Sequence, residues 1–307
     1  MWNRIDRVRR AGTATSDRRE FLKSSLLLAG AAPLASGLAA KSGYQIGCWT
    51  RPWAKVDYPL AFDGIAEAGY KNIGLMSLML NGKPVNIGSE TTPEEAAALR
   101  REVEKRGLRV ISVWGGPFPY QKSLEAGIAG LKRIIDNCAV CRSPSLLLGG
   151  VGKPEQAEPY YKVVSESCEY AASKRVRLSV KPHGGTNSTG KDCRKLVERV
   201  GHKNFGIFYD PGNIFYYSDG RLDPVDDAPS VDGLVVGMTV KDFRMPKEVM
   251  LTPGTGMVNF REVLARLKNG GFTRGPLLVE CLDPGDLAQT NAQARKARSF
   301  VEGLVKG

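Results

Sequence analysis

The sequence predicts an α/β protein with a single (β/α)8 barrel, a TIM barrel, over residues 41–307. Short runs rich in β-branched and aromatic residues occur eight times after residue 43, and most are separated by segments with helix signals. Eight alternating strand and helix units over about 260 residues are typical of a closed barrel. No Gly-x-Gly-x-x-Gly follows the first run, which argues against an open dinucleotide-binding sheet.

The predicted strands differ in length but share this composition. They are residues 44–49, 72–76, 109–114, 145–148, 176–181, 205–210, 234–241 and 277–281. Between the second and third strands, the Thr-Pro-Glu-Glu at 92–95 predicts a helix start, with Thr as the N-cap and acids in the first turn. Apolar residues keep helical spacing over 258–267, and Gly270-Gly271 ends that helix. Asp219-Gly220 and Pro224 predict an interrupted helix after the sixth strand.

Composition excludes several classes of protein. The chain has 307 residues, of which 42% are hydrophobic and 25% charged, so a core can form without disulfide or metal support. No apolar run reaches the roughly 18 residues of a membrane span. The net charge is +12, and residues 41–307 contribute +8 without a Lys/Arg block. This scattered excess is not typical of a nucleic-acid surface.

Residues 1–40 are predicted to be an export signal. Paired arginines in the sequence Ser-Asp-Arg-Arg-Glu-Phe-Leu-Lys at 16–23 precede a mildly apolar run at 24–34. This order resembles a twin-arginine signal peptide, which implies a periplasmic or extracytoplasmic protein. We expect cleavage near 37–40, and the absence of cysteine there predicts no lipid anchor. The alternative is a basic amphipathic N-terminal helix.

The six cysteines do not form a recognisable disulfide framework, because a chain of this length needs none. Cys138 and Cys141 have Cys-x-x-Cys spacing, as in a redox site or half of a zinc site. No second pair and no neighbouring histidine accompany them, so we interpret them as small apolar residues near a helix end.

Reactive side chains cluster where the predicted strands end, which is where barrel enzymes hold their active sites. Aromatic residues, Trp49 and Trp114, follow early strands and offer stacking surfaces. The last four strands end in polar or ionisable residues: Lys181 with His183, Asp210 with Asn213, Thr239 with Lys241, and Glu280. This layout predicts a pocket for a small polar molecule, with Trp49, Trp114, His183, Asn213 and Thr239 as its binding residues.

These strand ends also carry motifs of a known family. They are Ala-Gly-Tyr at 68–70, Tyr-Asp-Pro-Gly-Asn at 209–213, Val-Lys-Asp at 240–242, Pro-Gly-Thr-Gly at 253–256, Gly-Phe at 271–272, Gly-Pro-Leu at 275–277 and Val-Glu at 279–280. The chain resembles, over residues 43–305, the xylose-isomerase-like barrels of sugar-phosphate isomerases and epimerases. The resemblance implies a carbohydrate substrate and proton transfer next to a carbonyl.

The resemblance also implies a divalent metal such as Mn, Mg or Zn, held by Glu, Asp, His and Glu at the ends of strands five to eight. Asp210 and Glu280 match two of these positions, whereas Lys181 and Thr239 occupy the other two. One hypothesis retains the metal on Asp210, Glu280 and His183. The other places the Lys181 ammonium where the metal would be, since an ammonium repels a cation and pairs with carboxylates.

Each candidate also has a structural explanation. Asp210 precedes Pro-Gly and would shape a turn. Glu280 ends an apolar strand, so it requires either a metal or a lysine partner. Lys241 and Asp242 form either an internal ion pair or a substrate contact.

The main functional hypothesis is an exported isomerase or epimerase. Glu280 is the expected base, Asp210 shares that task, and a metal, Lys181 or Lys241 stabilises the enediolate. Free sugars, keto-sugars or oxidised glycosides are the expected substrates, and a lyase-type elimination is an alternative. Apurinic-site endonucleases share the fold but use a histidine-rich zinc cluster, and this chain has only two histidines. A non-catalytic sugar-binding barrel remains open.

Overall fold

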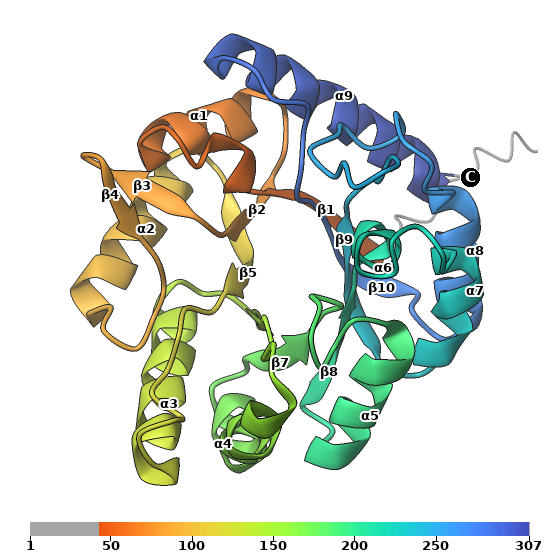
Figure 1. Cartoon of the computed structure of the whole chain (residues 1–307). Helices are drawn as coiled ribbons and strands as arrows, with labels where there is room; N and C mark the ends of the chain where they lie inside the picture. Colours follow the sequence, from red (N-terminus) through yellow and green to blue (C-terminus); the bar gives the residue numbers. More distant parts are fainter. Residues whose placement is uncertain (1–42, 307) are drawn as a thin grey trace, which may run out of the picture. The chain divides into compact units, whose positions relative to one another are not determined.

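The computed structural model describes residues 43–306, and these form a closed barrel of eight parallel strands surrounded by helices (Figure 1). The barrel order is β1-β10-β9-β8-β7-β6-β5-β2. Its strands are β1 Gly43–Trp49, β2 Asn72–Leu75, β5 Arg109–Trp114, β6 Ser145–Leu148, β7 Arg177–Val180, β8 Phe205–Tyr209, β9 Val235–Val240 and β10 Arg274–Val279. The predicted (β/α)8 barrel is therefore confirmed, and the predicted signal at 1–40 lies outside the described residues.

The helices connect successive strands on the outside of the barrel (Figure 1). They are α1 Tyr58–Glu67, α2 Pro93–Lys105, α3 Leu124–Val140, α4 Pro154–Ser173, α5 Gly190–Val200, α6 Pro211–Tyr217, α7 Pro224–Asp227, α8 Phe260–Asn269 and α9 Leu287–Lys306, with 3-10 turns η1 Arg51–Trp53 and η2 Ala228–Val231. Among the described helices, none is long and apolar enough to cross a membrane.

Local sequence explains where these helices begin and end. Thr92 and Glu95 form a reciprocal capping box at the start of α2, as the sequence predicts. The helix predicted over 258–267 is α8, two residues later at each end, with Asn259 as its N-cap. The weak segment after the sixth strand is divided into the short α6 and α7.

Two local features differ from the prediction. β10 begins at Arg274, three residues earlier than predicted, because Gly275 and Pro276 pair with β1. The predicted strands also omit a hairpin, β3 Leu78–Leu80 and β4 Lys83–Val85, which lies beside the barrel. Its turn is Asn81-Gly82, and both residues have positive φ, so the Asn-Gly signal for a hairpin was present in the sequence.

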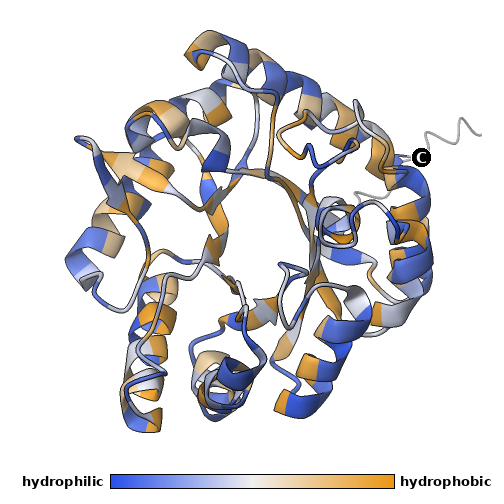
Figure 2. Ribbon diagram, viewed as in Figure 1, coloured by the Kyte–Doolittle hydropathy of each residue, from blue (hydrophilic) through white to orange (hydrophobic). Residues whose placement is uncertain are grey.

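Apolar residues form two packed regions. The larger lies between the strands and the helices, whose inward faces are more hydrophobic than their outward faces (Figure 2). Cys138 and Cys141 are buried near the end of α3, which confirms their interpretation as packing residues. The smaller region fills the barrel interior and consists of Trp49, Met76, Ile111, Leu147, Phe208 and Leu278. This cluster, which we call the interior floor, closes the barrel below the C-terminal strand ends, where barrel enzymes hold their active sites.

Candidate active site

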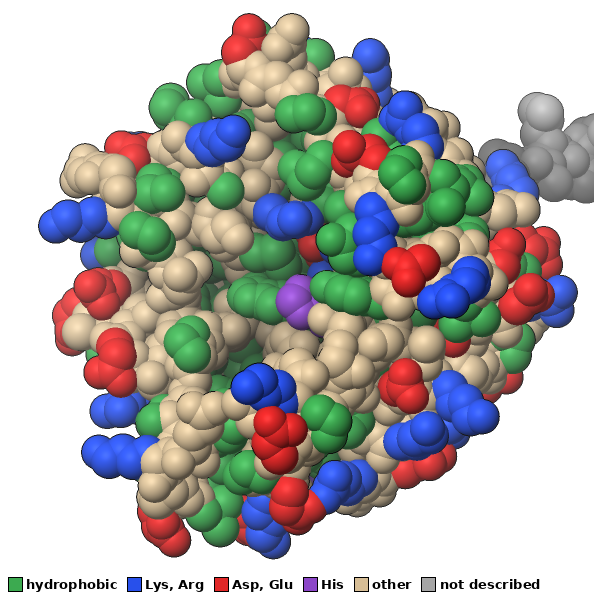
Figure 3. All heavy atoms as spheres, in the orientation of Figure 1, with side chains coloured by type: hydrophobic (Ala, Val, Ile, Leu, Met, Phe, Trp, Pro, Cys, Tyr) green, Lys and Arg blue, Asp and Glu red, His purple; other side chains and the backbone are tan. Residues whose placement is uncertain are grey.

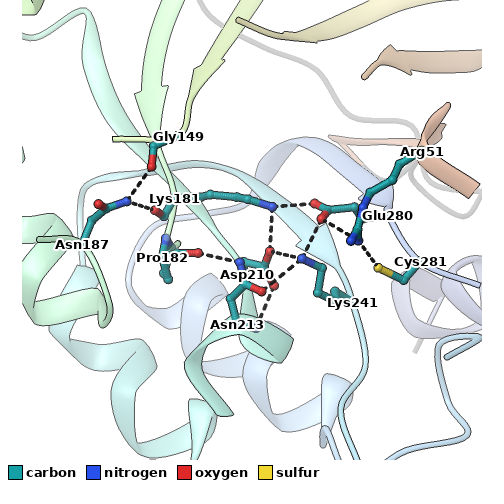
Figure 4. Close-up of polar contacts among 10 residues, drawn as sticks. All are labelled: Arg51, Gly149, Lys181, Pro182, Asn187, Asp210, Asn213, Lys241, Glu280 and Cys281. Atoms are coloured by element: carbon teal, nitrogen blue, oxygen red, sulfur yellow. Dashed lines mark hydrogen bonds and ion pairs between the residues drawn. The ribbon is translucent and has the colours of Figure 1, made fainter. Parts of the chain in front are cut away.

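Four buried charged residues meet at the C-terminal ends of four adjacent strands (Figure 4). Lys181, Asp210, Lys241 and Glu280 follow β7, β8, β9 and β10 directly. The Lys181 Nζ lies 3.0 Å from Asp210 Oδ2 and 2.6 Å from Glu280 Oε2. The Lys241 Nζ lies 3.3 Å from Asp210 Oδ2 and 2.6 Å from Glu280 Oε1. We call these four residues the charge tetrad; each lysine bridges both carboxylates.

The two lysines differ in the hydrogen-bond and ion-pair partners of their ammonium groups. An ammonium has three N–H donors. Lys241 donates a hydrogen bond to Asn213 Oδ1 at 3.1 Å and forms ion pairs with Asp210 and Glu280. Lys181 has two carboxylate acceptors within the described residues, and its Nζ lies 5.3 Å from the centre of the Trp114 ring. Lys181 therefore has one N–H without an acceptor among the described residues, and this N–H can donate to another oxygen.

Loop backbone and amide groups fix the tetrad in place. Asp210 is the N-cap of α6 and accepts a hydrogen bond from the Asn213 N–H at 3.0 Å. The Asn213 side chain donates to Pro182 O at 2.7 Å and accepts from Lys241. Both ends of this amide are occupied by protein groups, so Asn213 holds Lys241 against the loop after β7, and its predicted substrate contact stays a prediction. Asn187 similarly joins two loops by donating to Gly149 O and Lys181 O.

Burial and charge oppose each other at the tetrad. Burial raises the pKa of Glu280, but the positive charges of Lys181, Lys241 and Arg51 outweigh it and hold that pKa well below its usual range. Burial lowers the pKa of Lys241, but Asp210 and Glu280 outweigh it and raise that pKa. Glu280 is therefore a carboxylate at neutral pH, and Lys241 an ammonium.

Arg51 adds a fifth charge, which is not among the predicted site residues. Its Nη1 lies 3.3 Å from Glu280 Oε1 and donates to Cys281 Sγ at 2.6 Å. Arg51 is the first residue of η1, which follows β1, and β1 is paired with β10 in the barrel. Arg51 lies two residues after the end of the first predicted strand, and this position could have identified it as a site residue from the sequence. Burial raises the pKa of Cys281 to about 11, so this thiol is neutral at neutral pH.

The structure places His183 and Trp114 at the rim and Trp49 in the barrel interior. The His183 ring is solvent-exposed and packs 5.2 Å from Trp114 and 6.0 Å from Tyr217. Partial desolvation by its neighbours and the charge of Lys181 lower the pKa of His183. Trp49 is fully buried against Phe208 below the tetrad. The Trp49 ring lies in the interior floor, so the predicted stacking contact with a substrate stays a prediction.

Thr239 is also buried, and its hydroxyl has no hydrogen-bond partner within the described residues. It lies on β9, two residues before Lys241. The predicted substrate contact of Thr239 stays a prediction.

The donor set does not fit a divalent metal. Within residues 43–306, no group of three or more His, Cys, Asp or Glu side chains is arranged to hold one. The predicted set of Asp210, Glu280 and His183 is not assembled, because ammonium groups occupy the carboxylate oxygens and His183 lies at the rim. Two ammonium groups within 3.3 Å of the carboxylates would repel a cation at the same position.

The alternative of a Lys241–Asp242 ion pair is not observed. Asp242 instead accepts hydrogen bonds from the backbone N–H groups of Gly254, Gly256 and Val258. The carboxylate therefore holds the Pro-Gly-Thr-Gly loop, and Lys241 points to the tetrad. This contact explains why the two motifs occur together in the chain.

Two cavities border neighbours of the tetrad rather than the tetrad itself, and they share Ser77. One, of about 280 Å³, is bordered by Arg51, Lys55 and Asp283. The other, of about 440 Å³, is bordered by Trp114 and the loops after β5 and β6. Figure 3 shows this face, with hydrophobic side chains and a histidine around the hollow at its centre. A ligand entering from this face meets both cavities beside the tetrad.

Comparison with known proteins agrees with this architecture. The family model described as xylose isomerase-like TIM barrel matches residues 62–303, and the chain belongs to this family. A probable L-ribulose-5-phosphate 3-epimerase of Mycoplasma pneumoniae is 29% identical over 146 residues. That match covers 46% of this chain and 45% of the relative, so the chain aligns with about half of that protein.

Solved structures share the fold at low identity. A xylose isomerase domain protein from Planctomyces limnophilus has a TM-score of 0.64 and 20% identity, covering 85% of this chain and 97% of that one. D-psicose 3-epimerase from Clostridium cellulolyticum H10 has a TM-score of 0.66 and 12% identity, covering 85% and 99%. D-allulose 3-epimerase from Methylomonas sp. has a TM-score of 0.65 and 16% identity, covering 85% and 97%. Two of these three structures are sugar 3-epimerases, and at these identities the likeness shows a shared fold.

Proposed function

We propose that this protein is a carbohydrate isomerase or epimerase that transfers a proton next to a carbonyl of a sugar or keto-sugar. The observation that carries the proposal is a buried carboxylate, Glu280, in direct contact with two ammonium groups at the catalytic face of the barrel. Proton abstraction next to a carbonyl requires a base together with a positive charge for the developing enediolate. The family membership and the sugar epimerases among the relatives support the same reaction class.

In this proposal, Glu280 is the base and Lys181 stabilises the oxyanion. The unused N–H of Lys181 binds the carbonyl oxygen of the substrate, and the negative charge that develops there draws the ammonium away from Glu280. Because the lysines are what lower the pKa of Glu280, weakening that contact raises its basicity as the substrate binds. Asp210 keeps both lysines in position throughout.

No step in this scheme uses a metal, because the Lys181 ammonium supplies the positive charge. The Lys181 side chain is 1% exposed, so a substrate reaches it only if the rim residues move. Trp114 and His183, which pack on each other at that rim, are the proposed first contacts of the sugar.

We also propose that the protein is exported by the twin-arginine route. An exported enzyme would meet mainly unphosphorylated sugars, so this route favours unphosphorylated substrates.

The test is incorporation of deuterium from D2O into a panel of aldoses, ketoses and oxidised methyl glucosides, followed by NMR. We expect exchange at a carbon next to a carbonyl, and Glu280→Gln should reduce its rate by about 10²–10⁴-fold. Glu262→Gln, on α8, is the matched control and should retain the wild-type rate.

Thermal melting of both variants separates a lost base from a lost fold. Absence of exchange in every sugar, with a folded wild-type protein, would contradict the proposed reaction and leave a sugar-binding barrel. Exchange accompanied by loss of the group attached to the sugar would instead identify the alternative, a lyase-type elimination.

A further inference from the structure

We propose that the cavity of about 440 Å³ beside the tetrad binds an apolar or aromatic group attached to the sugar, so that the substrate is an oxidised glycoside, which carries a ring carbonyl, rather than a free monosaccharide. This inference rests on the proposed function, because it takes the tetrad as the place where the sugar reacts. We call the cavity the aromatic cavity. Its volume lies within the range of about 300–1,000 Å³ that is usual for small-molecule sites.

Aromatic rings form one side of this cavity. Phe118 and Tyr160 have ring centres 4.9 Å apart, and Tyr120 packs edge-on against Tyr160 at 5.1 Å. Trp114 completes the aromatic lining. Rings at such separations form a rigid surface on which a planar or apolar group can pack.

Glycines leave the other side open. Gly115, Gly116, Gly149 and Gly150 follow β5 and β6 and border the cavity. At Gly149 a Cβ atom would lie 3.0 Å from Trp114 Cζ2, and at Gly116 it would lie 3.0 Å from Gly88 Cα. Larger residues at these positions would therefore displace Trp114 or the neighbouring loop.

The charge of the lining indicates the chemistry of the bound group. The cavity is bordered by Ser77, Asn86, Trp114, Gly115, Gly116, Pro117, Phe118, Tyr120, Gly149, Gly150, Val151 and Tyr160, and none of these carries a charge. A phosphate in this cavity would have no cationic partner, whereas an uncharged ring would lose little solvation on entering. By contrast, the smaller cavity is bordered by Arg51 and Lys55. The aromatic cavity thus suits a neutral group.

Trp114 connects the cavity to the reaction centre. The same ring that borders the cavity lies 5.3 Å from Lys181 Nζ and 5.2 Å from the His183 ring. A sugar held at Lys181 and His183 would therefore place its substituent against Trp114 and into the aromatic cavity. A substrate with two linked parts matches two adjoining spaces of different polarity.

The test is calorimetric binding of phenyl and methyl glucosides, in both anomeric forms, to the whole mature protein. Aromatic packing contributes about 0.5–1.5 kcal/mol beyond buried area, so we expect a phenyl glucoside to bind about tenfold more tightly than the methyl glucoside. Tyr120→Leu should remove most of that difference. Tyr170→Leu, at a half-buried tyrosine on α4 outside the cavity, is the matched control and should preserve it.

Equal affinity for phenyl and methyl glucosides, or no binding of either, would overturn the aromatic cavity. A preference that Tyr120→Leu leaves unchanged would overturn it as well. These outcomes are independent of catalysis. Deuterium exchange without a phenyl preference refutes only the cavity, whereas a Tyr120-dependent preference without exchange refutes only the proposed reaction.

Discussion

At the scale of the residue, two lysines determine what the centre can do. Lys181 and Lys241 neutralise two carboxylates that would otherwise be buried without compensation. The same carboxylates would attract a divalent cation if one lysine were replaced by an oxygen ligand. A single side chain therefore decides between an ammonium-based centre and a metal centre.

Substituting Lys181→Glu tests this choice. The variant adds a third carboxylate to those of Asp210 and Glu280, in the place where an ammonium stood, and hard cations prefer oxygen ligands. We expect stoichiometric Mn²⁺ binding by calorimetry and a melting temperature that rises with Mn²⁺, since a ligand of the native state stabilises it. The wild-type protein should show neither effect.

Lys268→Glu, at an exposed position on α8, makes the same charge change away from the centre and should not create a site. Stoichiometric Mn²⁺ in the wild-type protein, lost on substitution of His183, would instead support the metal set predicted from the resemblance.

The sequence identified all four tetrad members from their strand-end positions, but it did not predict which of them form ion pairs with each other.

At the scale of the element, the start of α6 is built against the end of β9. A Cβ atom added at Gly212 would lie 2.6 Å from Lys241 O and 2.9 Å from Asp242 O. Only a residue without a side chain permits this approach between the helix and the loop. The Pro-Gly-Asn motif is thus a packing requirement that also places Asp210 and Asn213.

We expect Gly212→Ala to lower the free energy of unfolding by about 1–3 kcal/mol, because the added methyl group pushes on backbone atoms. Lys241 should move with that backbone, so activity should fall together with stability. Urea denaturation gives the stability change. Gly303→Ala is the control: its Cβ meets no atom within 4 Å, and helix propensity predicts up to about 1 kcal/mol of stabilisation. Equal stabilities for the two variants would show that the contact at Gly212 is not tight.

At the scale of the whole molecule, the proposed export determines which substrates the barrel meets. The paired residues Arg18 and Arg19 precede a weakly apolar run, and both lie outside the described residues. Replacing both with lysine keeps the charge but removes the feature that defines the signal. We expect the precursor to accumulate in the cytoplasm, measured by fractionation and immunoblotting.

Lysine at Arg9 and Arg10 provides the control for this experiment, because it alters basic residues outside the motif. That variant should be exported normally. Normal periplasmic levels of the Arg18 and Arg19 variant would refute the twin-arginine assignment.

The sequence alone determined the barrel and the positions of its reactive side chains. Strand and helix signals are local, and parallel strands in a barrel bring their C-terminal ends to one face. Lys181, Asp210, Lys241 and Glu280 were therefore predictable as neighbours. The capping box at α2 and the break after Asp210 were predictable for the same local reason.

Only the tertiary structure decided how those side chains pair. Glu280 meets Lys181, 99 residues away, and Arg51, 229 residues away, and no local pattern encodes such contacts. How far a strand-end tryptophan is exposed depends on strand tilt and register: Trp49 is fully buried in the interior floor, whereas Trp114 packs against that floor and is partly exposed. Distances of about 3 Å between buried charges arise from packing of the complete barrel. Those distances determine which side chains form ion pairs and what chemistry the pairs support.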